Sequence, residues 1–78
     1  AAPQQQVNES QVNDVVQSAL LALSDEHRAV IVLHYFSGCD YRQISDTLDI
    51  PEKTVKSRLF SARRQLKLRL AQHGIFSS

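Results

Sequence analysis

Apolar residues recur at steps of three and four along the first third of the chain. They are Val12, Val15, Val16, Ala19, Leu20 and Leu23. This spacing places the side chains on one face of an α-helix. Either Asn8, with Gln11 three residues later, or Ser10 is a suitable N-cap. We therefore predict an amphipathic helix over residues 8–23.

The next segment is apolar on nearly every side. Its apolar residues are Ala29, Val30, Ile31, Val32, Leu33, Tyr35 and Phe36. Taken alone, a run so rich in β-branched residues also suits a strand. The flanks favour a helix, because Ser24 is a good N-cap, and Ser37 and Gly38 end the run after about three turns. We expect this helix to be central in the core.

A proline separates two further helices. Asp40 and Gln43 have the spacing of a capping box at the start of a short helix. Ile44 and Leu48 stand one turn apart and supply the buried side of that helix. Pro51 disfavours a helical residue before it but suits the start of a new helix. The pattern predicts two helices that meet at a tight turn.

The last helix has two contrasting faces, and we expect it to run from about Glu52 to Gln72, with Gly74 as its terminator. On a helical wheel, its core-facing stripe consists of Val55, Leu59, Ala62, Leu66 and Leu70. The outer arc consists of Lys53, Lys56, Ser57, Phe60, Ser61, Arg63, Arg64 and Lys67, and Arg58 flanks the other edge of the stripe. No acidic residue follows Glu52, so these positive charges have no acidic neighbour along the helix.

The small net charge of +1 hides a division between two arms of opposite sign. Residues 1–49 contain two basic and seven acidic side chains, a net charge of −5. Residues 50–78 contain seven basic side chains and one acidic side chain, a net charge of +6. The second arm is therefore suited to a polyanion.

Length and composition exclude several classes of protein. The 78 residues suffice for one compact domain, predicted over 10–73, between a linker remnant at 1–9 and a tail at 74–78. No apolar run is long enough for a membrane span, which predicts a soluble, cytoplasmic protein. The single Cys39 cannot form an internal disulfide. Neither the seven-residue spacing of His27 and His34 nor any other group of residues suggests a metal site, a cofactor or an enzyme.

A short helix, a turn and a second helix with a polar, basic beginning is the helix-turn-helix arrangement, in which the second helix enters the DNA major groove. Side chains able to reach base edges or phosphates are Lys53, Thr54, Lys56, Ser57 and Arg58. Further along the same helix, Arg63, Arg64 and Lys67 suit phosphates. The sequence therefore predicts an all-α, four-helix domain with a C-terminal helix-turn-helix and a long recognition helix.

The same residues resemble a known family. The stretches IS at 44–45, LDIPEKTVKSRL at 48–59 and AR at 62–63 are similar to the C-terminal promoter-reading domain of extracytoplasmic-function bacterial sigma factors. LSDEHRAV at 23–30 and YFSG at 35–38 extend the resemblance to roughly residues 15–70. It implies a domain that reads the minus-35 promoter element while the flap of the RNA polymerase β subunit holds it, and an anti-sigma factor as a further partner. Catalysis is not part of this role.

The resemblance also implies particular DNA contacts. It places them on Lys53, Thr54, Lys56, Ser57, Arg58 and Ser61, with Arg63 nearby and Arg42 on the preceding helix. Three positions depart from the family's usual pattern. Asp49 replaces a common glycine, although aspartate tolerates a left-handed backbone better than most residues. Lys53 replaces a small residue, which is expected to alter base preference, and Ser61 replaces a longer side chain, which is expected to lose a contact.

Two other functions remain open at this point. One is the output domain of a response regulator, whose recognition helix usually has a histidine soon after Thr-Val-Lys, where this chain has Ser57 and Arg58. The other is a sigma mimic that sequesters an anti-sigma factor, whose recognition helix would lose its positive charge. The role of Phe60 is also open, between a groove or partner contact and packing against Phe76. The acidic first arm is a candidate docking surface for polymerase or an anti-sigma factor.

Overall fold

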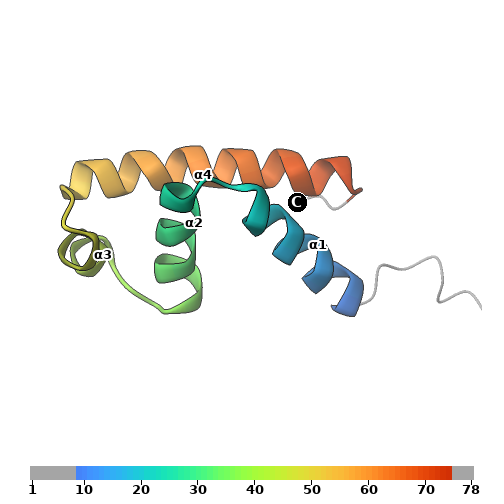
Figure 1. Ribbon diagram of the computed structural model, residues 1–78, viewed down its shortest axis with the longest axis horizontal. Coiled ribbons are helices and arrows are strands. Elements are labelled where there is room, and N and C mark those ends of the chain that lie inside the picture. The colour runs from blue at the N-terminus through green and yellow to red at the C-terminus, as the bar shows by residue number, and fades with distance from the viewer. Residues whose placement is uncertain (1–8, 75–78) are drawn as a thin grey trace, which may run out of the picture.

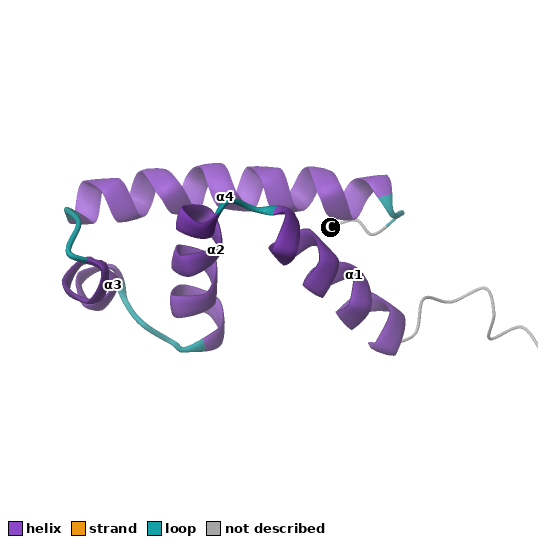
Figure 2. Cartoon of the chain, viewed as in Figure 1, coloured by secondary structure: helices purple, strands orange, loops and turns teal. Residues whose placement is uncertain are grey.

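The computed structural model describes residues 9–74, which form helices and no strand (Figures 1 and 2). In chain order these are α1 (Glu9–Ala22), α2 (Asp25–Ile31), the π-helix η2 (Val32–Phe36), α3 (Tyr41–Leu48) and α4 (Glu52–Gln72). The predicted all-α class is confirmed. None of the described helices is long and apolar enough to cross a membrane.

The longest helix, α4, is the platform of the fold. Figure 1 shows α1, α2 and α3 along the same side of α4, with α3 at its beginning and α1 towards its end. The core draws on all of these helices and on the α1–α2 corner. Its members are Leu20, Leu23, Val30, Ile31, Ile44, Val55, Leu59 and Ala62. The predicted stripe of α4 is confirmed at its first three positions, which are fully buried, whereas Leu66 and Leu70 are half-buried.

The segment expected to be the central core helix is only partly buried. As predicted, Ser24 caps it, and the Ser24 hydroxyl accepts from the amide of His27 at 3.3 Å. The α-helical part ends at Ile31, and the chain continues as η2, whose wider turns were not predicted. Only one side of this segment meets α4, so Tyr35 is 51% exposed and Phe36 is 64% exposed. The expected central position in the core therefore holds for Val30 and Ile31 but not for these two rings.

Arg28 fixes the corner between α1 and α2. Its Nε donates to the Leu20 carbonyl at 3.0 Å and its Nη2 donates to the Leu23 carbonyl at 2.9 Å. A third contact pairs Nη1 with the Asp25 carboxylate at 3.1 Å. The last carbonyls of a helix have no partners within the helix, and Arg28 satisfies two carbonyls at this corner. One side chain of α2 thereby sets the direction of α1.

The predicted capping box of α3 is confirmed. The backbone amide of Gln43 donates to Oδ1 of Asp40, and the backbone amide of Asp40 donates to Oε1 of Gln43, both at 2.8 Å. For α1, the structure begins the helix at Glu9, so Ser10 lies inside the helix and is not its N-cap. Asn8, the other candidate cap, lies outside the described residues.

The turn between α3 and α4 is held by its own backbone and by Ser45. Asp49 adopts the left-handed conformation, with φ 57° and ψ 49°. Its amide donates to the Ser45 carbonyl, as does the amide of Ile50 at 3.1 Å. The Ser45 hydroxyl donates to the Ile50 carbonyl in return. Pro51 then caps α4 in an extended conformation, so the predicted proline break is confirmed and the two helices meet in a fixed corner.

Candidate nucleic-acid interface

The outer arc of α4 is open to solvent. Because the other helices pack on one side of α4, nothing in the described part of the chain covers the opposite side (Figure 1). Exposed members of the arc are Lys53, Lys56, Ser57, Phe60, Arg63, Arg64 and Lys67, and Ser61 is half-buried. Thr54 is half-buried at the start of the same helix. The arc presents five cations and no carboxylate, which is the electrostatic pattern of a phosphate-binding surface.

Two aromatic rings lie in or next to this arc. Phe60 is 64% exposed in the middle of the arc and packs into no part of the described core. Its alternative partner, Phe76, lies outside the described residues. Tyr41, the first residue of α3, has its ring centroid 5.8 Å from Nζ of Lys56. The two helices of the motif therefore touch through a cation–π contact.

Arg58 lies apart from the other predicted DNA contacts. Its Nη2 is 3.4 Å from Oε2 of Glu26 at the start of α2, and its side chain is 26% exposed. This position agrees with the predicted location of Arg58 beyond the far edge of the apolar stripe. Arg58 therefore links the recognition helix to α2, and a DNA contact from this guanidinium requires it to share or leave Glu26.

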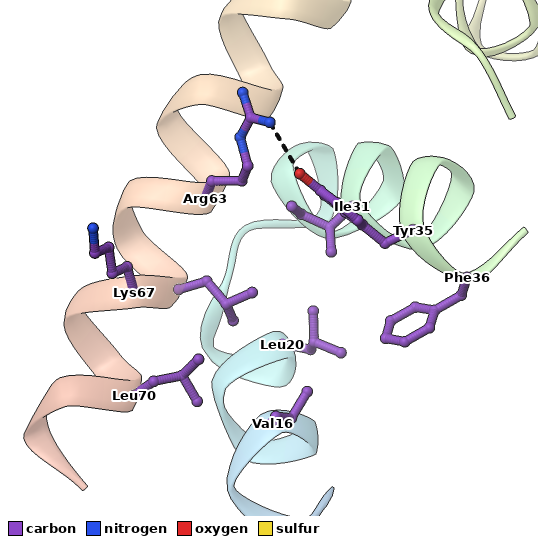
Figure 3. A pocket seen from close by; sticks show the side chains of 9 residues that line it. Val16, Leu20, Ile31, Tyr35, Phe36, Arg63, Lys67 and Leu70 are labelled. Carbon is purple, nitrogen blue, oxygen red and sulfur yellow. Dashed lines mark hydrogen bonds between the residues drawn. The ribbon is translucent and has the colours of Figure 1, made fainter. Parts of the chain in front are cut away.

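Arg63 and Lys67 border a second surface, an apolar groove of about 380 Å³ between α1, η2 and α4 (Figure 3). Its lining consists of Val16, Leu20, Ile31, Tyr35, Phe36, Arg63, Leu66, Lys67 and Leu70. Nη1 of Arg63 donates to the hydroxyl of Tyr35 at 2.9 Å across the rim of this groove. Two members of the arc that were predicted as phosphate contacts therefore also line the groove.

Arg42, His27 and His34 lie on helices other than α4. Arg42 is exposed on α3, beside a shallow hollow that Tyr41 and Glu52 also line. Nδ1 of His34 lies 2.9 Å from the Cys39 carbonyl, whereas Nδ1 of His27 is buried without a hydrogen-bond partner. Within residues 9–74 no three metal-ligating side chains gather in one place. Both histidines pack within the fold, and neither belongs to the arc.

Sequence reasoning missed Tyr35 and Tyr41 as neighbours of the arc. Tyr35 and Arg63 are 28 positions apart, and no local pattern signals a pair so distant in the chain. Tyr41 offered a weak signal, because an aromatic residue directly after the α3 cap stands close to the start of the recognition helix. The polar arc itself was visible from helical spacing alone.

Comparison with known proteins bears on these surfaces. The profile of the family described as Sigma-70, region 4, matches residues 13–66. The chain is 48% identical over 61 residues to the ECF RNA polymerase sigma factor SigL of Mycobacterium tuberculosis, an alignment covering 78% of this chain and 34% of the relative. It is 38% identical over 72 residues to ECF sigma factor SigE of Mycolicibacterium smegmatis, with 92% and 28% covered.

A more distant relative gives the same result. The ECF RNA polymerase sigma factor SigW of Bacillus subtilis is 34% identical over 68 residues, which cover 87% of this chain and 36% of the relative. The chain thus spans about a third of the length of these curated relatives. The family match extends from α1 through α2, α3 and the turn into α4 as far as Leu66. The chain therefore belongs to the sigma-70 region 4 family.

Proposed function

We propose that this domain reads the minus-35 element of bacterial promoters for a sigma factor and docks on core RNA polymerase in the cytoplasm. The observation that carries this proposal is the single-signed outer arc of α4, presented directly after a helix-turn-helix corner. Family membership supports it, because the relatives are RNA polymerase sigma factors by name. The response-regulator alternative loses its support, since the matched family is region 4 of sigma-70. A sigma mimic is disfavoured by the intact positive arc.

The proposed DNA contacts fall into two groups, nearly all on α4. Lys53, Thr54, Lys56 and Ser57 lie in its first two turns and are proposed to reach base edges or the adjacent phosphates. The remaining proposed contacts are Arg42, Arg58, Ser61, Arg63, Arg64 and Lys67. Most of these suit phosphates, which fix register and carry no direct sequence information. Specificity is therefore expected to reside at the beginning of the helix.

The test is transcription from a library of promoters randomised upstream of the start site, by core polymerase with the full-length factor. We expect the transcribed templates to share a short sequence at the minus-35 position, and core polymerase alone to enrich none. Exchanging α4 residues 53–57 for those of another region 4 domain should change the enriched sequence at that position alone. Enrichment that is indifferent to this exchange would contradict the proposal.

The groove is proposed as the surface by which polymerase holds the domain. Its rings at Tyr35 and Phe36 and its half-buried Leu66 form an exposed apolar patch, which is a common mark of a protein interface. The groove lies beside α1 and η2, away from the helix-turn-helix corner, so both partners can bind at once. An apolar segment of the β-subunit flap is the proposed occupant.

Two phenylalanines provide a matched test of whether the groove binds polymerase and the arc binds DNA. Phe36→Asp is expected to weaken binding of the chain to the isolated flap segment by about ten- to a hundred-fold, because a ring buried at the interface is lost. Phe60→Asp changes a ring of equal exposure, 64%, but on the DNA arc. We expect it to leave flap binding unchanged and to weaken promoter binding. Fluorescence anisotropy measures flap binding of both variants with a labelled flap peptide and promoter binding with a labelled promoter fragment. Equal effects of the two substitutions on flap binding would refute the assignment.

The acidic arm is proposed as a surface for an anti-sigma factor. Exposed carboxylates on α1 to α3 include Asp14, Asp25, Glu26 and Asp46. None of them belongs to the outer arc, and Glu26 pairs with Arg58. A partner with a basic face would gain association rate and orientation from this complementary charge.

A further inference from the structure

The cation–π contact between α3 and α4 joins a half-buried ring to an exposed cation. Nζ of Lys56 lies 5.8 Å from the ring centroid of Tyr41, within the range in which the ring quadrupole attracts a cation. Lys56 is in the second turn of the recognition helix, and Tyr41 begins the helix before it. Figure 1 shows that these two helix starts lie at the same end of the molecule.

The Tyr41 ring is itself held in place from behind. It packs against the hydrophobic core, and its centroid is 5.4 Å from that of His34 at an interplanar angle of 41°. His34 is fixed in turn by its 2.9 Å contact to the Cys39 carbonyl. Tyr41 is therefore a rigid platform under a side chain that would otherwise be flexible.

Lys56 has an alternative partner that it does not use. Glu52 stands four residues earlier, a spacing at which glutamate and lysine commonly pair on a helix. Within residues 9–74, however, neither of the two ion pairs involves Lys56 or Glu52. The Lys56 ammonium is directed towards the Tyr41 ring, and those of its N–H donors that do not face the ring remain available to a ligand.

We propose that Tyr41 is a positioning residue that pre-orders Lys56 for promoter DNA, an inference that rests on the proposed function. A free lysine loses much rotamer freedom when its ammonium is immobilised on DNA. A lysine already held over a ring loses less, so binding is tighter without any new contact to DNA. Tyr41 does not touch DNA in this role and acts only through Lys56.

The experiment measures promoter affinity of holoenzyme formed with the full-length factor, on a fragment selected from the library. Tyr41→Leu, which keeps apolar bulk but removes the ring, is expected to weaken binding about two- to five-fold. Tyr41→Phe keeps the ring and is expected to bind as the unaltered protein does. In the Lys56→Ala background Tyr41→Leu should have no further effect, whereas in the Lys53→Ala background its full effect should persist.

A second measurement follows Lys56 without DNA. The ε-methylene protons of Lys56 should show an upfield NMR ring-current shift that survives Tyr41→Phe and disappears in Tyr41→Leu. Equal losses of affinity from Tyr41→Leu in both lysine backgrounds would show a packing role and overturn the inference, as would absence of the ring-current shift. If Lys56→Ala weakens binding and Tyr41→Leu does not, the role of Tyr41 alone is overturned. If the unaltered holoenzyme ignores the minus-35 sequence, the proposed function falls as well.

Discussion

Replacing Leu59 with alanine is expected to lower the free energy of unfolding by about 2–5 kcal/mol, a large part of the stability of a domain of this size. Leu59 is completely buried in the middle of α4, in the cluster to which α1, α2 and α3 all contribute. Truncation removes apolar contacts and leaves a cavity that surrounding helices cannot fully close. Domains of this size rarely have more than about 3–5 kcal/mol of stability in total.

Leu68 provides the control for this variant. It is on the same helix and undergoes the same substitution, but its side chain is 59% exposed. Leu68→Ala is expected to change stability by less than about 0.5 kcal/mol, because alanine is at least as good a helix former as leucine. Urea unfolding followed by far-ultraviolet circular dichroism compares the two. Similar midpoints for both variants would contradict the central position of Leu59.

The double substitution Lys53→Ala with Lys56→Ala is expected to weaken promoter binding by about ten- to a hundred-fold without unfolding the domain. Both side chains are exposed at the beginning of α4, so neither truncation opens a cavity. Each lysine that neutralises a phosphate releases counterions, so the slope of log affinity against log salt should become shallower by about 2. Fluorescence anisotropy over a salt series, with circular dichroism to verify folding, gives both quantities.

The control removes positive charge from α4 outside the arc. Arg69 is exposed near the end of the helix, beside the hollow that Leu23 and Leu68 line. Arg69→Ala should leave the salt slope unchanged. Arg58 is unsuitable for this test, because its removal would also break the ion pair with Glu26. A fall in affinity with an unchanged salt slope in the double variant would show that these lysines do not contact phosphates.

Local signals in the sequence predicted most of the helices and the corner between the last two. The apolar spacing of α4, the Asp40 and Gln43 capping box and the break at Pro51 each depend on a few neighbouring residues. The left-handed Asp49 was expected because the family commonly has glycine there, and the structure has φ 57° at this position. These features require no knowledge of what lies across the fold.

Features that depend on contacts between helices were not predicted. The π-helix η2 has the apolar spacing of an ordinary helix, so the sequence did not distinguish the two. Phe36 is exposed because only one side of the α2–η2 segment meets α4. Arg28 was visible as a basic residue, but its carbonyl partners belong to the preceding corner. The same holds for Arg58 with Glu26. Pairing of side chains across the fold depends on helix directions, which periodicity does not determine.

The hydrogen bond between Arg63 and Tyr35 gives the two proposed surfaces a shared group. A phosphate that engages Arg63 competes with the Tyr35 hydroxyl, so its net gain is smaller than that from an unengaged arginine. A ligand in the groove that takes the hydroxyl would release the guanidinium to DNA. Thermodynamic linkage then requires the reverse, with bound promoter favouring the groove ligand by the same factor. Promoter DNA and a groove ligand would in this way favour each other's binding, because the Arg63 guanidinium donates either to the Tyr35 hydroxyl or to a phosphate.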